Sequence, residues 1–245
     1  MTDRLVEAAL TAARAAGAIA LRYFRGDVRV MRKADLTPVT EADRAVEGEI
    51  RRLLATERPD DAILGEEGGA AGTGLRRWIV DPIDGTRNYA RGIPVWATLI
   101  ALEVDGTVQI GVVAAPALHG RWWAERGSGA LANGEPMHVS AIGRIEEAVL
   151  SFSIETKVPP LARDAWHVRG LGDFWAHMLV AEGAVDGAVD ADGLSEWDLA
   201  AVQVIVEEAG GRFSDAGGES RIDSGSAITS NGLLHDELLA AVNGA

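Results

Sequence analysis

The order of the elements that the sequence predicts indicates an α/β fold built in layers. Apolar segments separated by short turns fill the middle of the chain, and helices alternate with strands in its last third. Neither a repeat nor a low-complexity linker divides the 245 residues. We therefore expect a single domain over residues 1–245, with an internal seam near residue 142.

The first third of the chain predicts two helices and several short strands. Apolar residues recur at helical spacing over residues 4–24, and the alternating stretch 27–33 predicts a strand. An extended segment around Pro38 leads into a second helix that begins near Thr40. Two short apolar strands, AILG and WIV, then run directly into acidic residues and glycines.

The remainder predicts hairpins, followed by helices and strands in alternation. Asp105-Gly106 and Asn133-Gly134 are the best short hairpin signals in the chain, and they place turns within segments 96–118 and 120–137. Gly210 and Gly211 close the last long helix. The later predicted segments are a strand at 146–154, a helix and strand within 174–192, the helix of 197–211, and a strand and helix within 228–242.

The composition excludes several classes of protein. The chain has no cysteine, so disulfides, zinc–thiolate sites, iron–sulfur clusters and cysteine nucleophiles are excluded. A formal net charge of −14 argues against nucleic acid as a partner, because phosphate contacts require Lys and Arg. The N-terminal segment carries charges that a signal peptide lacks, and no stretch approaches the ~20 apolar residues of a membrane-spanning helix. We expect a cytoplasmic protein without a membrane partner.

Carboxylates gather at predicted strand ends and helix starts, where ligand sites of open α/β sheets form. Because converging carboxylates repel one another, either protonation or a divalent cation must relieve the repulsion. Carboxylates combined with a backbone carbonyl suit Mg²⁺, and two ions ~3.5–4 Å apart stabilise phosphoryl displacement. The residues concerned are Asp43, Glu66, Glu67, Asp81, Asp84 and Asp198.

Each of these carboxylates also has a purely structural interpretation. Asp43 and Asp198 stand where helix-capping residues stand, and Glu66-Glu67 before glycines is typical of a solvated turn. The stretch DPIDGT at 81–86 has turn chemistry of its own. However, both of its aspartates closely follow an apolar strand. A helix beginning at Gly85-Thr86 would offer backbone N–H groups to a phosphate, and the threonine hydroxyl would position a water.

Four stretches resemble the signature blocks of the inositol monophosphatase family. The resemblance covers nearly the whole chain, and the stretch DPIDGT is its most specific part. It implies a layered αβαβα sandwich of the inositol monophosphatase and sugar phosphatase type, Mg²⁺-dependent hydrolysis of a small phosphate ester, and a homodimer. The stretches are KADLTPVTEAD at 33–43, GEE at 65–67, WIVDPIDGT at 78–86 and WDLAAVQVIVEEAGG at 197–211.

The resemblance also implies roles for individual residues around two or three Mg²⁺ ions. Glu66, Asp81 and the carbonyl of Ile83 correspond to ligands of a first ion, and Asp81, Asp84 and Asp198 to ligands of a second. Glu66, with Asp43 through waters, would hold a weaker third ion. The phosphate would contact Asp84 and the turn at Gly85 and Thr86, while Thr86, with Asp43 or Glu66, would orient the attacking water.

Within the family, four further stretches resemble the histidinol-phosphate phosphatase branch of actinobacterial type: 91–102, 115–130, 172–186 and 230–237. Histidinol carries a cationic amine, so its site should offer additional carboxylates. Asp173 is the first candidate, although it stands where it would also cap a helix starting at Phe174. The family's substrate-contacting glutamate before the WD pair has no match at the expected spacing here, which makes Asp190 a second candidate.

Three functions therefore remain open from the sequence. The leading one is histidinol-phosphate phosphatase in L-histidine biosynthesis. The same set of carboxylates would also serve an inositol-1-phosphate phosphatase or a broader sugar-phosphate phosphatase. A metal- or phosphate-binding protein without catalysis is the alternative of another class. The apolar segments 94–102 and 113–124 fit either a dimer interface or the core.

Overall fold

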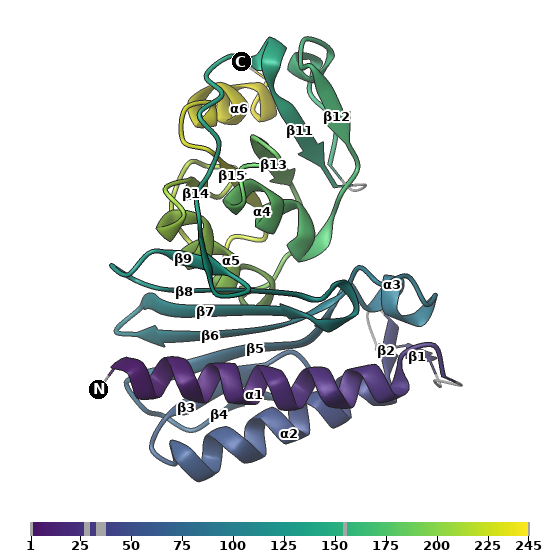
Figure 1. Ribbon diagram of the computed structural model, residues 1–245, viewed down its shortest axis with the longest axis vertical. Coiled ribbons are helices and arrows are strands. Elements are labelled where there is room, and N and C mark those ends of the chain that lie inside the picture. Colours follow the sequence, from purple (N-terminus) through teal and green to yellow (C-terminus); the bar gives the residue numbers. More distant parts are fainter. Residues whose placement is uncertain (1, 27–29, 33–37, 154–155, 245) are drawn as a thin grey trace.

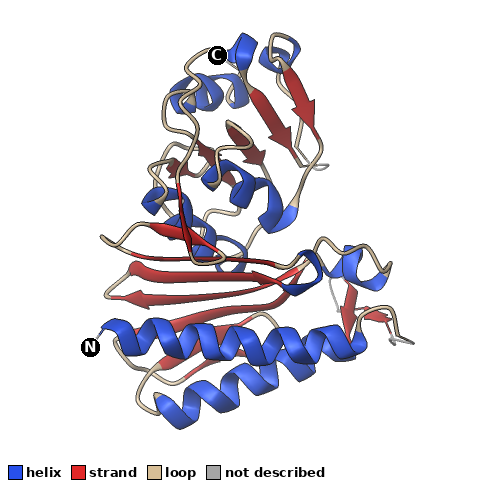
Figure 2. Ribbon diagram, viewed as in Figure 1, coloured by secondary structure: helices blue, strands red, loops and turns tan. Residues whose placement is uncertain are grey.

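The structure is a computed structural model that describes residues 2–26, 30–32, 38–153 and 156–244. It confirms the layered αβαβα sandwich, in which two helical layers and an outer helix alternate with two sheets (Figures 1 and 2). Residues 33–37 of the first signature block lie outside the described residues. The helices are α1 (Thr2–Tyr23), α2 (Glu41–Glu57), α3 (Thr86–Ala90), α4 (Asp173–Ala181), α5 (Glu196–Glu208) and α6 (His235–Val242).

The first sheet has eight strands in the order β10-β9-β8-β7-β6-β5-β3-β4. All neighbours are antiparallel except β3 and β5, which are parallel. Both Asp-Gly and Asn-Gly hairpin predictions are confirmed, between β6 and β7 and between β9 and β10. The strands are β3 (Ala62–Gly65), β4 (Gly69–Ala71), β5 (Arg76–Asp84), β6 (Ala97–Val104), β7 (Thr107–Ala115), β8 (Gly120–Glu125), β9 (Ala130–Ala132) and β10 (Glu135–Met137).

The second sheet has five strands in the order β12-β11-β13-β15-β14. Strand β11 runs parallel to β12 and β13, whereas β15 is antiparallel to both of its neighbours. A separate pair, β1 (Val30–Arg32) and β2 (Pro38–Thr40), precedes α2. The strands of the second sheet are β11 (Val149–Phe152), β12 (His167–Arg169), β13 (Gly187–Asp190), β14 (Arg212–Ser214) and β15 (Ala227–Ser230).

Helices α1 and α2 cover the outer face of the first sheet (Figure 1). Helix α1 packs closely because its buried stripe is made of small side chains: Ala9, Ala12, Ala16 and Ala20 have no exposed surface. Helix α2 is capped by Thr40, whose hydroxyl accepts hydrogen bonds from the backbone N–H groups of Ala42 and Asp43. This cap fixes where the helix starts.

Helix α5 lies between the two sheets, and every residue from Leu199 to Val206 is buried. A helix covered by two sheets is mostly apolar, and the one polar residue of this stretch, Gln203, donates a hydrogen bond to the Ser220 hydroxyl. Its approach to β7 requires Gly111, where a Cβ atom would lie 2.6 Å from both the Ala201 carbonyl oxygen and Val204 Cγ1. The glycine therefore sets the distance between α5 and the first sheet.

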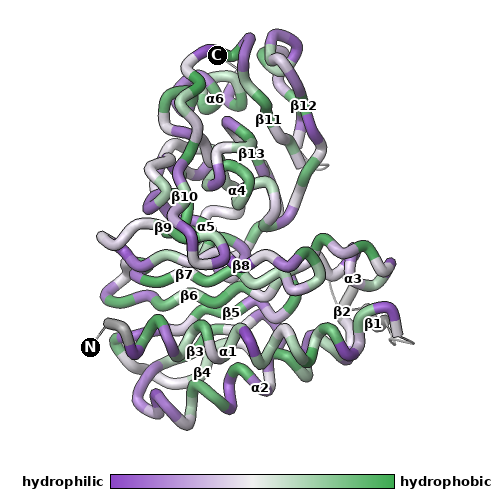
Figure 3. Tube along the Cα trace, viewed as in Figure 1, coloured by the Kyte–Doolittle hydropathy of each residue, from purple (hydrophilic) through white to green (hydrophobic). Residues whose placement is uncertain are grey.

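Strand β6 is buried on both faces from Ala97 to Leu102, because helices cover the sheet on each side. Figure 3 shows the corresponding apolar run in β6 and β7. Of the two interpretations of segment 94–102, this burial supports the core. One apolar cluster joins side chains from both sheets, α4 and α5, so the seam predicted near residue 142 crosses a shared core. Among the described residues, no helix has the length and apolarity needed to cross a bilayer.

Candidate active site

A β-bulge turns two aspartates of β5 toward one side of the sheet. Asp81 pairs with Leu99 and Asp84 with Ala97, so three steps along β5 match two along β6. In a regular strand, residues three apart point to opposite faces, and one extra residue restores a common face. Pro82 fits within the bulge because it has no N–H to donate to the ladder.

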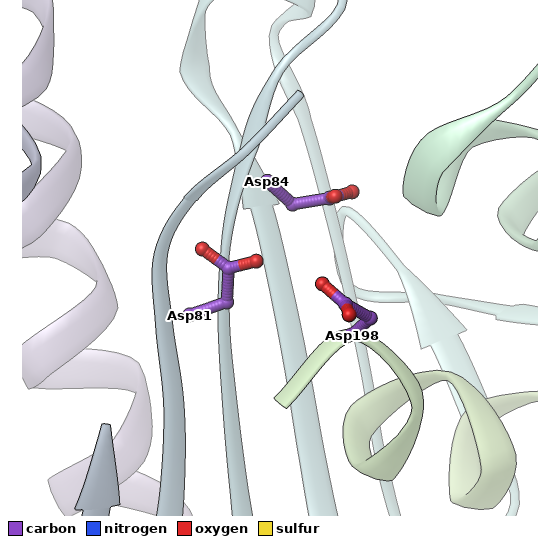
Figure 4. Close-up of side chains that lie close together, drawn as sticks. All are labelled: Asp81, Asp84 and Asp198. Carbon is purple, nitrogen blue, oxygen red and sulfur yellow. The ribbon is translucent and has the colours of Figure 1, made fainter. Parts of the chain in front are cut away.

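Asp198 reaches the same place from the first turn of α5. Its Oδ2 accepts a hydrogen bond of 2.6 Å from the backbone N–H of Ser195, which holds the carboxylate at the start of the helix. Asp81, Asp84 and Asp198 each offer one carboxylate oxygen, and these oxygens lie within 4.8 Å of one another. Figure 4 shows the three side chains pointing into a common space. Asp198 therefore both caps α5 and belongs to the carboxylate cluster.

Asp43 is likewise both a helix-capping residue and a neighbour of the cluster. Its Oδ2 accepts hydrogen bonds from the Thr40 backbone N–H at 2.7 Å and from the Thr40 hydroxyl at 2.5 Å. The Thr86 hydroxyl lies 3.3 Å from Asp43 Oδ1 and 2.8 Å from the carbonyl oxygen of Ile83. Thr86, Asp43 and Ile83 thus form one connected group beside the aspartate cluster.

Glu66 lies outside the three-carboxylate group but within its electrostatic reach. Its negative charge helps to raise the pKa of Asp81, Asp198 and Asp43. Its backbone N–H donates to the Val80 carbonyl oxygen at 3.2 Å, which ties it to β5 next to Asp81. Glu66 is partly buried and stands in the turn between β3 and β4.

Burial and mutual repulsion hold these carboxylates toward their protonated forms. Burial is the first cause of a raised pKa at Asp81, Asp84 and Asp43, followed at Asp81 by the charges of Glu66, Asp84 and Asp198. At Asp198 burial raises the pKa to about 6, against the Ser195 N–H, which lowers it. A divalent cation would relieve this repulsion, so the donor set fits a hard cation with oxygen ligands.

Asp173 lies at the edge of the site in a left-handed backbone conformation, with φ at 56°. Its Oδ2 accepts a hydrogen bond from Asn88 Nδ2 at 3.1 Å, and its negative charge contributes to the raised pKa of Asp84. The next backbone N–H, of Phe174, donates to Asp84 Oδ2 at 2.6 Å. Helix α4 begins at Asp173 with Gly172 as its N-cap, so Asp173 is not the cap, and its carboxylate lies beside Gly85.

Gly85 is required where α3 begins beside Asp173. Its φ is 78°, and a Cβ atom there would lie 2.9 Å from the Val95 carbonyl oxygen and 3.3 Å from Asp173 Oδ2. A larger residue would push the turn away from Asp173. The glycine thus keeps the predicted phosphate contact and the predicted amine contact close together.

The second substrate candidate, Asp190, is engaged elsewhere. It is 5% exposed, and its Oδ2 lies 2.9 Å from His177 Nε2, while His177 Nδ1 lies 2.8 Å from the Thr229 hydroxyl. A contact between Asp190 and substrate would have to use Oδ1 or displace His177 from Oδ2. Glu196, which also precedes the WD pair, instead forms an ion pair with Arg77 of β5 at 2.5 Å.

The sequence interpretation did not identify Glu47, Asn88 or Ser195, which contact the site residues. Glu47 follows Asp43 by one helical turn, and this spacing places both on one face of α2. Asn88 follows Thr86 by two residues within DPIDGTRN, and Ser195 precedes Asp198 at the spacing of a capping box. Spacing was therefore the available signal for all three.

Comparisons with known proteins agree with this geometry. The sequence profile of the inositol monophosphatase family matches residues 1–245. The chain belongs to the inositol monophosphatase family. It is accordingly a phosphoric monoester hydrolase, and the predicted family membership is confirmed.

Individual relatives cover almost the whole chain. The histidinol-phosphatase of Mycobacterium tuberculosis is 48% identical over 98% of each chain. The histidinol-phosphatase of Streptomyces coelicolor is 46% identical over 94% of this chain and 93% of the relative. Among solved structures, the IMPase of Thermotoga maritima has a TM-score of 0.90 at 36% identity, with 99% of this chain and 97% of that chain covered.

Proposed function

We propose that this phosphatase hydrolyses histidinol phosphate with the help of Mg²⁺ and serves L-histidine biosynthesis. The observation that carries the proposal is the meeting of Asp81, Asp84 and Asp198 oxygens within 4.8 Å. Near-complete coverage by two relatives named histidinol-phosphatase supports the choice of substrate. The Asp173 carboxylate beside Gly85 further supports this choice of substrate, because the alcohol part of histidinol phosphate carries a cationic amine.

The residues around the cluster fit two or three Mg²⁺ ions. Glu66, Asp81 and the Ile83 carbonyl would hold one ion, and Asp81, Asp84 and Asp198 a second. Glu66 and Asp43 would hold a third through waters. When bound, these ions would supply positive charge for the phosphate and lower the pKa of a bound water. The bound ions would thereby allow an anionic phosphate to bind in a site that is lined by carboxylates.

Thr86, Asp43 and Glu66 orient the attacking water in this proposal. The Thr86 hydroxyl donates to one oxygen acceptor at a time, and both Ile83 O and Asp43 Oδ1 lie within reach. This contact fixes the hydroxyl oxygen, which then accepts a hydrogen bond from the water. The charge of Glu66 helps to raise the pKa of Asp43, and either carboxylate can accept the water's proton.

Asp173 is the residue that we propose binds the amine of histidinol. Its carboxylate accepts a hydrogen bond from Asn88 Nδ2, and a carboxylate can accept several hydrogen bonds at once, so an ammonium group can join its partners. Gly85 keeps this carboxylate close to the phosphate-binding turn with Thr86. A substrate with a phosphate at one end and an ammonium at the other would span this distance.

Phosphate release from a panel of esters tests the proposal. With Mg²⁺ present, we expect histidinol phosphate to give the highest kcat/KM, ahead of inositol 1-phosphate and fructose 1,6-bisphosphate. A preference for inositol 1-phosphate would assign the alternative within the family. No release from any ester, despite bound Mg²⁺, would support the non-catalytic binding protein.

We also propose a homodimer that works in the cytoplasm, as the family resemblance implies. Light scattering coupled to gel filtration measures the oligomeric state directly. A mass near twice 25.8 kDa is expected. A mass of one chain at micromolar concentration would contradict the dimer.

A further inference from the structure

We propose that Glu47 is a positioning residue of the metal site, which holds the turn that carries Glu66. This inference rests on the proposed assignment of Glu66 as a metal ligand. Glu47 itself lies on α2, one helical turn after Asp43, and is 2% exposed. Its carboxylate faces the turn between β3 and β4, not the three-aspartate cluster.

Both oxygens of the Glu47 carboxylate bind the backbone of that turn. The Glu67 N–H donates to Oε2 at 2.7 Å, and the Gly68 N–H donates to Oε1 at 2.8 Å. These two N–H groups directly follow Glu66 in the chain. On the other side, the Glu66 N–H is held by the Val80 carbonyl oxygen at 3.2 Å. Glu66 is therefore fixed between α2 and β5.

Arg51 follows Glu47 by one helical turn and also binds the turn between β3 and β4. Its Nε donates to Glu47 Oε1 at 2.7 Å, and its Nη2 donates to the Gly69 carbonyl oxygen at 2.5 Å. The guanidinium balances the charge of the buried Glu47 carboxylate, which would otherwise be costly to desolvate. It also contacts the end of the same turn, so the turn is bound along its length from Glu67 to Gly69.

The glycines of GEEGG leave the room that Glu47 occupies. A Cβ atom on Gly65 would lie 2.5 Å from Glu47 Oε1, and one on Gly68 would lie 2.7 Å from that atom. Neither position has a left-handed φ, so close approach and not backbone freedom requires glycine there. The sequence around Glu66 is thus shaped to receive this carboxylate.

A residue that orients a metal ligand acts on metal affinity, and loss of such partners typically weakens it 10- to 100-fold. In Glu47→Gln, the amide NH₂ that replaces one oxygen cannot accept a backbone N–H. We expect the Mg²⁺ dissociation constant of the full-length protein, measured by isothermal titration calorimetry, to rise about 10- to 100-fold. The thermal unfolding midpoint without Mg²⁺ is measured in parallel.

Gly68→Ala tests the same contact without altering Glu47, and it decides the question if Glu47→Gln does not fold. Its methyl group would displace the carboxylate, so the Mg²⁺ dissociation constant should rise in the same way. Gly48→Ala is the control on the same helix, because no atom lies within 4 Å of the added Cβ. It should leave Mg²⁺ affinity unchanged.

Asp186→Asn controls for a general loss of stability. Asp186 is also a buried carboxylate, with the Val149 N–H donating to it at 2.6 Å and the Ser140 hydroxyl as a second partner, but it lies directly before β13 of the second sheet. We expect this variant to unfold at lower temperature while keeping its Mg²⁺ affinity. A parallel loss of affinity in Asp186→Asn would overturn the positioning role.

Asp84→Asn separates failure of this inference from failure of the proposed function. If Asp84→Asn binds Mg²⁺ as the wild type does, the cluster is not the metal site and the proposed function fails. If Asp84→Asn loses Mg²⁺ while Glu47→Gln and Gly68→Ala keep wild-type affinity, only the role of Glu47 is refuted. If Asp84→Asn, Glu47→Gln and Gly68→Ala all lose Mg²⁺ affinity while Gly48→Ala and Asp186→Asn keep it, the positioning role of Glu47 is supported.

Discussion

At the scale of single residues, Asp84 links three parts of the molecule. Asp84 is the last residue of β5, and its Oδ2 accepts a hydrogen bond from the Phe174 N–H of α4. One of its carboxylate oxygens also lies in the cluster with oxygens of Asp81 and Asp198. Asn at this position would still accept the Phe174 N–H but would carry no charge, so this change should affect chemistry more than folding.

The variant Asp84→Asn keeps the shape of the side chain and removes its charge. Lost metal-mediated charge stabilisation amounts to several kcal/mol, so we expect kcat for histidinol phosphate to fall on the order of 10³-fold or more. Circular dichroism and the unfolding midpoint should stay close to wild type, since Asn can still accept the Phe174 N–H. Near-normal turnover with Mg²⁺ would contradict the site.

Asp173 should decide which alcohol is accepted. Asn tolerates the left-handed φ of 56°, so Asp173→Asn removes charge without adding backbone strain. A hydrogen bond to a charged group contributes about 1.5–3 kcal/mol, which predicts a rise in KM for histidinol phosphate of roughly 10- to 100-fold. Inositol 1-phosphate serves as the internal control, and an equal rise in its KM would refute a contact specific to the amine.

The metal-site candidates were predictable at this scale, whereas side-chain contacts between different elements were not. Asp81, Asp84 and Asp198 stand at strand ends and helix starts, which is a pattern visible along the chain. The engagement of Asp190 by His177 arises between β13 and α4, and no local spacing signals it. The same is true of Arg77, whose ion pair with Glu196 joins residues 119 positions apart.

At the scale of elements, the position of α5 determines where Asp198 lies. Gly111 of β7 allows the helix to approach the first sheet, and the start of α5 is joined to β5 by the Arg77–Glu196 ion pair. Because β5 carries Asp81 and Asp84, these two contacts help to set the distance across the carboxylate cluster. The packing of α5 on the first sheet therefore contributes to the geometry of the carboxylate cluster.

Gly111→Ala should disturb both stability and activity. The added methyl would lie 2.6 Å from the Ala201 carbonyl oxygen, and overpacking of this kind typically costs about 1–3 kcal/mol. Urea unfolding measures the loss, and kcat/KM should fall with it because Asp198 moves. Gly48→Ala, on the exposed face of α2, should instead stabilise by about 0.5–1 kcal/mol. Unchanged stability of Gly111→Ala would show that α5 can shift freely.

Elements with strong local signals were predicted correctly, and weaker ones were missed. The hairpins at Asp105-Gly106 and Asn133-Gly134 follow from turn chemistry that needs no tertiary context. Strands β12 and β14 have only three residues each, and no alternating pattern fits in so short a segment. The bulge in β5 depends on pairing with β6, so its effect on Asp81 and Asp84 required the structure.

At the scale of the whole molecule, pH should affect folding through His235. This side chain is fully buried, and it lies 2.9 Å from the Ser214 hydroxyl and 3.0 Å from the Ser230 hydroxyl. Burial lowers its pKa from 6.5 to about 4, with a smaller effect of Arg212. The unfolded chain then binds a proton at a higher pH than the folded chain does.

The folded state should therefore lose stability as pH falls from about 6.5 toward 4. In His235→Gln, the group that titrates is absent, so the fall in free energy of unfolding between pH 7.5 and pH 5 should be smaller than in wild type. Urea unfolding at pH 7.5 and pH 5, without Mg²⁺, measures this change in the free energy of unfolding for the wild type and for the variant. Equal differences in the two proteins would exclude His235 as the source.

The central claim is that buried carboxylates from both halves of the chain share a divalent cation. Anomalous diffraction from crystals soaked in Mn²⁺, a scattering substitute for Mg²⁺, tests it most directly. We predict strong anomalous peaks bridged by Asp81, Asp84 and Asp198, with Glu66 in contact with one of them. Crystals that show no peak among these side chains at saturating Mn²⁺ would contradict the claim.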